Sequence, residues 1–169
     1  GFLDFSNVTS FNLDEYVGLD GNSPYSYRYF MNENLFNHIN IKREKTFVPN
    51  GKTDNMEDFC KNYDKKIEEA GGIDIQILGI GENGHIAFIE PDSSLPVNTS
   101  IVDLTEDTIN VNSRFFDSVN EVPKTAISMG IGSILKAKSI VLLANGNRKA
   151  DAIRDILKCE GISTQIPAS

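Results

Sequence analysis

Residues 73–91 have the sequence IDIQILGIGENGHIAFIEP, an apolar run followed by a loop that holds glycines, a histidine and a glutamate. The isoleucine-rich run at 73–78 predicts a buried strand. Glycines free the backbone to turn sharply and to approach a ligand closely. In an open α/β sheet, ligands bind at the carboxyl ends of the strands. His85 and Glu90 therefore stand where chemistry is expected.

The same loop matches the G-x-G-x-x-G fingerprint of dinucleotide-binding proteins through Gly79, Gly81 and Gly84. Asp103 follows about 20 residues later, as that fingerprint requires. The fingerprint also needs a full helix directly after the glycines, whose N-terminus faces the pyrophosphate. Pro91 comes too soon for such a helix, because proline disfavours helix in the residue before it. We therefore favour a turn that presents catalytic groups over an NAD site; a turn without function would leave the histidine and the glutamate unexplained.

Composition limits the possible functions. The 169 residues suffice for one domain with a sizeable core, and the formal net charge of −8 argues against a nucleic-acid surface. A phosphorylated small molecule stays compatible with that charge, because one or two local cations suffice to bind it. Cys60 and Cys159 have no metal-ligand spacing around them and indicate free thiols of a reducing compartment. Without a membrane-span run or a signal-peptide pattern, we expect a cytoplasmic protein.

Strand and helix patterns alternate along the chain, which predicts an α/β fold built on one parallel sheet. We expect strands at 8–13, 73–78, 100–104 and 139–144, the last of them buried on both faces. We expect helices at 27–36, 53–70, from 105 onward and at 148–157. No repeat or linker divides the chain, so residues 1–169 are expected to form a single domain. Four phenylalanines are expected in the core: Phe11, Phe30, Phe115 and Phe116.

Several side chains suit acid–base chemistry. Asp14 follows a strand end beside Glu15, where a carboxylate can serve as a general base for a C–H proton if its surroundings tune it. The alternative is a solvated strand end or a helix cap. His85 can move protons between oxygens near neutral pH, and Glu90 can orient its ring. Asn83 can hold a sugar hydroxyl or the same histidine.

Two cations complete the candidate site. Arg114 lies in the segment NSRFF at 112–116, and Lys149 stands at the start of the last expected helix. Arginine suits bidentate phosphate contact, lysine acts as a point charge, and a helix N-terminus attracts anions. Taken singly, each of them also fits a plain surface charge.

Four segments together resemble the glucosamine-6-phosphate deaminases: FNLDEY at 11–16, GIGENGHIAFIEP at 79–91, NSRFF at 112–116 and VPK at 122–124. They occur in the family's order and at compatible spacing, and the resemblance spans essentially the whole chain. It implies a Rossmann-like, mostly parallel sheet with flanking helices in three layers. The implied reaction opens the ring of glucosamine 6-phosphate, isomerises the aldose to a ketose, and releases ammonia to give fructose 6-phosphate.

The resemblance also implies roles for particular residues. The aspartate would abstract the proton from C2 and return it to C1, the histidine would assist ring opening, and the cations would hold the phosphate. No metal or organic cofactor is implied. The partner would be a small sugar phosphate rather than nucleic acid or membrane, with monomer and homo-oligomer both open. The implied catalytic residues are Asp14, Asn83, His85 and Glu90, and the implied substrate-binding residues are Gly79, Gly81, Arg114 and Lys149.

The chain departs from the family in two respects. Ile89 stands where the family usually has asparagine, and we expect this loss of a polar group to shift the loop or weaken catalysis. Family members begin with an earlier strand and a phosphate-gripping loop and end with a further strand and helix. The domain is therefore expected to be incomplete at both termini, and the isolated chain to be inactive or poorly stable. Three alternatives stay open: a galactosamine-6-phosphate isomerase, a 6-phosphogluconolactonase and a non-catalytic sugar-phosphate-binding module.

Overall fold

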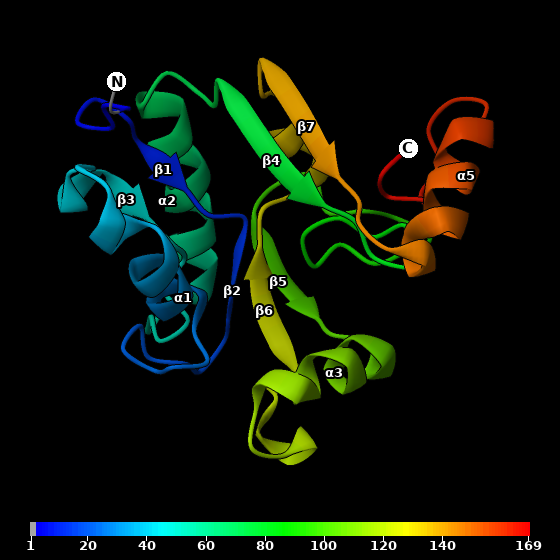
Figure 1. The fold of residues 1–169 in the computed structure, drawn as a ribbon, viewed down its shortest axis with the longest axis horizontal. Coiled ribbons are helices and arrows are strands. Elements are labelled where there is room, and N and C mark those ends of the chain that lie inside the picture. Colours follow the sequence, from blue (N-terminus) through cyan, green and yellow to red (C-terminus); the bar gives the residue numbers. More distant parts are fainter. Residues whose placement is uncertain (1–2) are drawn as a thin grey trace.

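Strands and helices alternate in the computed structural model, which describes residues 3–169 (Figure 1). The strands are β1 (Ser10–Phe11), β2 (Asp14–Tyr16), β3 (Thr46–Phe47), β4 (Ile75–Gly79), β5 (Ser100–Asp103), β6 (Thr125–Ser128) and β7 (Ser139–Leu143). The α-helices are α1 (Tyr27–Asn34), α2 (Met56–Glu69), α3 (Glu106–Asn112), α4 (Ile131–Leu135) and α5 (Ala150–Lys158). Single 3-10 turns lie at Phe36–His38, Arg43–Lys45, Ser113–Phe115, Val119–Glu121 and Asn147–Lys149.

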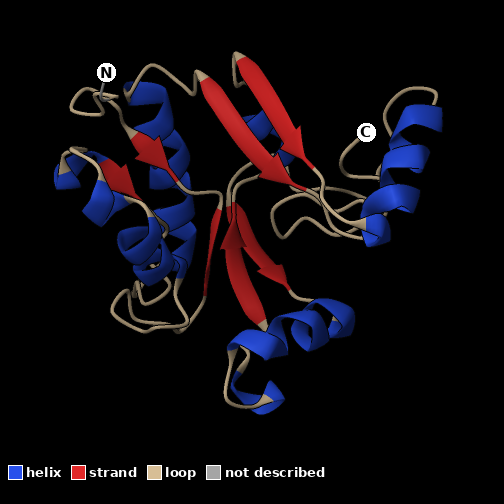
Figure 2. Cartoon of the chain, in the orientation of Figure 1, coloured by secondary structure: helices blue, strands red, loops and turns tan. Residues whose placement is uncertain are grey.

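The α/β class with parallel strand pairs and flanking helices is confirmed, but the strands do not form one sheet (Figure 2). β1–β3 and β4–β7 are parallel pairs, whereas β2–β6–β5 is antiparallel. Of the strand expected at 8–13, only Ser10–Phe11 forms a strand, and the next strand, β2, joins a different sheet. The N–H of Asn12 donates to the carbonyl of Phe47 at 2.8 Å, whereas the carbonyl of Leu13 accepts from the N–H of Met129 at 2.7 Å. This change of partner gives Asp14 a place in the antiparallel sheet.

Side-chain caps set the helix starts. Asn55 caps α2, its Oδ1 accepting from the N–H of Asp58 at 3.1 Å, so the helix begins later than the expected residue 53. Thr105 caps α3 as the sequence indicated, with Oγ1 accepting from the N–H of Thr108 at 3.2 Å. α1 ends at Asn34, shortly before the expected end at 36. No helix among the described residues is long and apolar enough to cross a bilayer.

The buried residues form two main clusters. The first joins α2, β4, the loop after β4 and α4, and the second joins β2, β6 and the segment around α3. Phe11 packs against the first cluster and Phe116 belongs to the second. Phe30 and Phe115, in contrast, are 56% and 61% exposed, which corrects the expectation that they are core residues. Phe30 lies on the solvent side of α1, and the ring of Phe115 lies 4.7 Å from the guanidinium carbon of Arg114.

The β4–β7 pair leaves apolar side chains open to solvent. In β4, Leu78 is 3% exposed, whereas Ile75 and Ile77 are 64% and 60% exposed. In β7, Val141 and Leu143 are 43% and 59% exposed. The expectations that 73–78 is a buried strand and that 139–144 is buried on both faces are therefore wrong for the described structure, because nothing in residues 3–169 covers the second face of this pair.

Candidate functional site

A cleft of about 440 Å³ collects side chains from segments far apart in the sequence. It draws on the start of β2, the loop after β4, helix α3 with the turn behind it, and the turn before α5. Five of the sequence-predicted site residues line it: Asp14, Asn83, His85, Arg114 and Lys149. Asp14 and His85, two of the implied catalytic residues, thus face one pocket.

Asp14 is the first residue of β2 and lies opposite Ser128 of β6. Burial raises the pKa of Asp14 to about 7, and the neighbouring charge of Glu15 adds to the rise. Glu15 itself is 2% exposed and accepts hydrogen bonds from the backbone N–H groups of Tyr27 and Arg28, both at 3.0 Å. Glu15, and not Asp14, is therefore the carboxylate that binds the N–H groups at the start of α1. Asp14 faces the cleft as a group that titrates near neutral pH.

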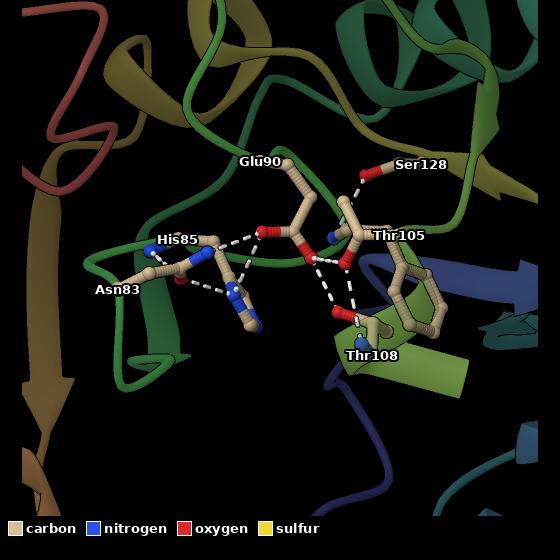
Figure 3. A network of polar contacts seen from close by, with 7 residues as sticks. Asn83, His85, Glu90, Thr105, Thr108 and Ser128 are labelled. Carbon is tan, nitrogen blue, oxygen red and sulfur yellow. Dashed lines mark hydrogen bonds and ion pairs between the residues drawn. The ribbon is translucent and has the colours of Figure 1, made fainter. Parts of the chain in front are cut away.

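The ring of His85 is held on its Nδ1 side (Figure 3). Nδ1 lies 2.7 Å from Oδ1 of Asn83 and 3.3 Å from Oε2 of Glu90. Nδ2 of Asn83 in turn donates to Oε2 of Glu90 at 2.7 Å. Nε2 has no hydrogen-bond partner within residues 3–169, so this nitrogen is the one available to a ligand.

Glu90 stays ionised behind the histidine. Its side chain is 12% exposed, and burial alone would raise the pKa of the carboxyl. Hydrogen bonds from His85, Thr108 and Asn83 outweigh burial and lower the pKa of Glu90 to about 2. A carboxylate with that pKa orients the imidazole, but it does not donate a proton near neutral pH.

The glycines of the loop make room for the imidazole. A Cβ atom added at Gly81 would lie 2.2 Å from Cε1 of His85, so only glycine leaves the ring in this position. Ala87, two residues beyond the histidine, has a φ of 52°, which is uncommon for a non-glycine residue. Gly79 and Gly81 do not line the cleft, and their assignment as substrate-binding residues stays a prediction.

The two predicted cations border the same cleft. Arg114 is exposed in the turn Ser113–Phe115 that follows α3, and Lys149 is partly buried in the turn Asn147–Lys149 before α5. The two side chains bring positive charge to a pocket that also holds the carboxyl of Asp14. This positive charge makes the pocket suitable for an anionic group. Among the described residues, no cluster of three or more His, Cys, Asp or Glu side chains is arranged to hold a metal ion.

Ile89 lies in the core and not in the cleft. It is 1% exposed and belongs to the cluster that contains Leu78 and Met129. Its N–H donates to the carbonyl of Ile86 at 2.9 Å, which closes the turn between the histidine and the glutamate. The turn is thus built with an apolar residue at this position, and the expected weakening of catalysis stays a prediction.

Sequence reasoning missed three residues of the site. Tyr27 and Thr108 line the cleft, and Thr105 donates to Glu90. Thr105 was noticed only as a helix start, although the two threonines are one helical turn apart and so share a face. Tyr27 is the first residue of the helix expected at 27–36, and its ring stacks on Tyr16 at 5.3 Å between centroids.

Fold and cleft together define an α/β protein whose pocket is lined by acid–base groups and by cations. The chain belongs to the family described as glucosamine-6-phosphate isomerases/6-phosphogluconolactonase, whose model matches residues 2–169. Curated relatives include a glucosamine-6-phosphate deaminase of a Thermoanaerobacter species, which is 57% identical over 169 residues. The same name belongs to a relative from Clostridium beijerinckii that is 59% identical over 167 residues.

Solved structures agree with this family. A monomeric glucosamine-6-phosphate deaminase superposes with a TM-score of 0.94 at 46% identity, over 98% of this chain and 68% of that one. A 6-phosphogluconolactonase from Thermotoga maritima gives a TM-score of 0.72 at 20% identity, over 99% of this chain and 69% of that one, which shows the shared fold. The match covers the whole of this chain but 66% of the Thermoanaerobacter protein, and 99% of this chain but 69% of the Clostridium protein. The chain therefore spans about two thirds of the length of these relatives.

Proposed function

We propose that this chain carries the acid–base site of a glucosamine-6-phosphate deaminase, which converts glucosamine 6-phosphate to fructose 6-phosphate and ammonia. The observation that carries the proposal is the shared cleft of Asp14, His85, Arg114 and Lys149. The names of the relatives at 57% and 59% identity support it.

The proposed steps follow from the side chains available. His85, held at Nδ1, uses its other nitrogen to move a proton from the O1 hydroxyl to the ring oxygen, which opens the sugar ring. Asp14 then takes the proton from C2; the C–H electrons form a C1–C2 double bond, and the carbonyl electrons move to O1. Delivery of the proton to C1, with the nitrogen lone pair forming the C2–N double bond, leaves an iminium at C2 and an oxyanion at O1. Water then adds to C2 and gives one proton to O1 and one to the nitrogen. Ammonia leaves and a carbonyl forms at C2, so C2 is oxidised and C1 reduced within one molecule.

The pKa of Asp14 suits this task. A base that both accepts and returns a proton works best with a pKa near the working pH. Burial raises the pKa of Asp14 to about 7, whereas hydrogen bonds lower the pKa of Glu90 to about 2. Two carboxylates of one site are thus tuned in opposite directions, which assigns proton transfer to the first and orientation of the histidine to the second.

The test is the release of ammonia from glucosamine 6-phosphate. Because the chain spans about two thirds of its relatives, the assay uses both the purified chain and a chimera in which residues 1–169 replace the matched segment of the Thermoanaerobacter protein. The proposal expects turnover in at least the chimera. It also expects Asp14→Asn to lower kcat by at least about a thousandfold, because the variant lacks the group that transfers the proton in the transition state. Absence of ammonia from both forms would contradict it.

The same variant separates the rivals. A lactonase needs no base at C2, so Asp14→Asn should leave hydrolysis of a 6-phosphogluconolactone nearly unchanged. A galactosamine-6-phosphate isomerase would prefer the other epimer, and a binding module would show a thermal shift with sugar phosphate but release no ammonia. We also propose that residues 1–169 belong to one domain and work in the cytoplasm, which agrees with the free thiols of Cys60 and Cys159.

A further inference from the structure

The two oxygens of the Glu90 carboxylate have separate partners (Figure 3). Oε2 faces the loop: it accepts from Nδ2 of Asn83 at 2.7 Å and lies 3.3 Å from Nδ1 of His85. Oε1 faces the first turn of α3 and accepts from the hydroxyls of Thr105, at 3.2 Å, and of Thr108. One oxygen therefore holds the imidazole, while the other is fixed to a helix.

We propose that Thr105 and Thr108 are positioning residues, which fix Glu90 and through it the ring of His85. The geometry stands without reference to a substrate. Its consequence for turnover rests on the proposed function.

The hydrogen bonds leave the Thr105 hydroxyl little freedom. A hydroxyl has one proton to donate and lone pairs to accept. Oγ1 of Thr105 accepts from the N–H of Thr108 at 3.2 Å, and its proton goes to Glu90. Thr108 is 8% exposed, so water does not readily replace its hydroxyl. The anchor is thus complete only when the first turn of α3 is formed.

Loss of the anchor would release the carboxylate. The terminal torsion of a glutamate is broad, so a carboxylate held at one oxygen alone can rotate. Oε2 would then no longer be fixed against His85, and the pKa of Glu90 would rise because a hydrogen bond that lowers it is gone. The other ionisable side chains that line the cleft are Asp14, Tyr27, Glu82, Asp107, Arg114 and Lys149.

The position of α3 predicts which kinetic constant changes. α3 begins directly after Thr105 and ends at Asn112, and Arg114 follows in the next turn. A hydroxyl deleted without loss of the helix leaves Arg114 in place, so binding of the anionic end should persist. We expect the loss to appear in kcat and not in KM.

The test compares Thr108→Val, which keeps the shape and removes the hydroxyl, with Thr108→Ser, which keeps the hydroxyl. Thr99→Val is the matched control, because Thr99 is 4% exposed and its hydroxyl donates to Asp64 at 2.6 Å outside the cleft. We expect Thr108→Val to lower kcat about tenfold with KM changed less than about twofold, from the strength of a hydrogen bond to a charged group. Thr108→Ser should stay within about threefold of the parent, and Thr99→Val should leave kcat unchanged.

A second measurement needs no substrate. The ¹³C shift of the Glu90 side-chain carboxyl, assigned with Glu90→Gln, is followed from about pH 1 to pH 6. The pKa of Glu90, about 2 in the parent, should rise by about one unit in Thr108→Val and stay in place in Thr99→Val. If neither the chain nor the chimera releases ammonia, the proposed function fails, yet this titration still decides whether the threonines hold the carboxylate.

Thr105→Asp keeps a good helix cap but sets a carboxylate against Glu90, and it serves if Thr108→Val does not fold. It should raise the pKa of Glu90 and lower kcat. The proposal is overturned if Thr108→Val, or Thr105→Asp in its place, leaves both kcat and the titration of Glu90 unchanged. It is also overturned if Thr108→Ser loses as much activity as Thr108→Val, because that result would assign Thr108 a packing role.

Discussion

The central strand of the antiparallel sheet and the parallel pair differ in burial. In β6 of the antiparallel sheet, Ala126, Ile127 and Ser128 are each 0% exposed. In β4 of the parallel pair, Ile75 and Ile77 are 64% and 60% exposed. Apolar, β-branched residues therefore predict a strand, but burial depends on what lies against it. The difference extends to the chemistry, because the proton-transfer candidate Asp14 belongs to the buried sheet and the loop of His85 follows the open one.

The largest expected effect lies in the buried sheet. Ile127→Ala removes a side chain that is 0% exposed in β6. We expect it to lower the free energy of unfolding by about 4 kcal/mol, from the lost apolar burial and the cavity left behind. Urea denaturation at neutral pH measures this. A loss below about 1 kcal/mol would mean that the greater burial of β6 does not make its side chains contribute more to the free energy of unfolding.

Ile89→Asn tests the core at the position where this chain has isoleucine and the family usually has asparagine. The side chain is 1% exposed, so the amide would enter an apolar cluster. We expect a loss of about 3 kcal/mol in the free energy of unfolding, from a buried polar group without partners, and no gain in turnover. The control is Ile89→Val, which should cost about 1 kcal/mol. A rise in kcat with unchanged stability would place this side chain in the cleft instead.

Asp14→Asn should make the folded protein more stable above neutral pH. Because burial raises the pKa of Asp14 to about 7, the folded state favours the protonated carboxyl. The stability that this group contributes is present below the pKa of the unfolded chain and is lost as pH rises through about 7. Asparagine resembles the protonated form at every pH. We expect a gain on the order of 2 kcal/mol at about pH 8, discounted because the side chain is only partly buried, and a gain that vanishes toward about pH 4.

Denaturation at several pH values measures that gain. A gain of the same size at every pH would mean that the variant acts by packing and not through the charge. Loss of turnover combined with higher stability would show that the ionised carboxylate of Asp14, which the reaction needs, lowers the stability of the folded state.

The smallest effect is expected in the open pair. Ile77→Ala removes a side chain that is 60% exposed, and we expect the free energy of unfolding of the isolated chain to change by less than about 0.5 kcal/mol. Urea denaturation side by side with Ile127→Ala gives the contrast directly. A cost above about 2 kcal/mol would mean that something covers this face in solution.

Local signals predicted the elements well. The glycine loop, the cap at Thr105 and the apolar runs placed most helices and strands near their observed positions, because each depends on neighbours in the sequence. The expected site residues Asp14, Asn83, His85, Arg114 and Lys149 line one cleft, and their roles stay predictions. That expectation came mainly from the family resemblance, since composition and spacing alone also allowed a surface charge or a helix cap.

What the sequence could not supply depends on contacts between distant segments. The change of sheet between Asn12 and Leu13 is fixed by Phe47 and Met129, which no local pattern reveals. The exposure of Ile77 depends on the absence of cover within residues 3–169, which its own neighbours do not encode. The hydroxyls at Glu90 were hidden because threonine at a helix start already has an ordinary explanation as a cap.

The close approach of the His85 ring to Gly81 has a consequence for evolution. Since any side chain at Gly81 would collide with the imidazole, the two positions are expected to covary: a homologue that gains a side chain at the first should have lost the histidine at the second. Gly81, which matches a dinucleotide-binding fingerprint, would then be required by the space that the His85 ring occupies and not by a bound nucleotide. An alignment could use this pair to tell degenerate paralogues from working members before any of them is purified.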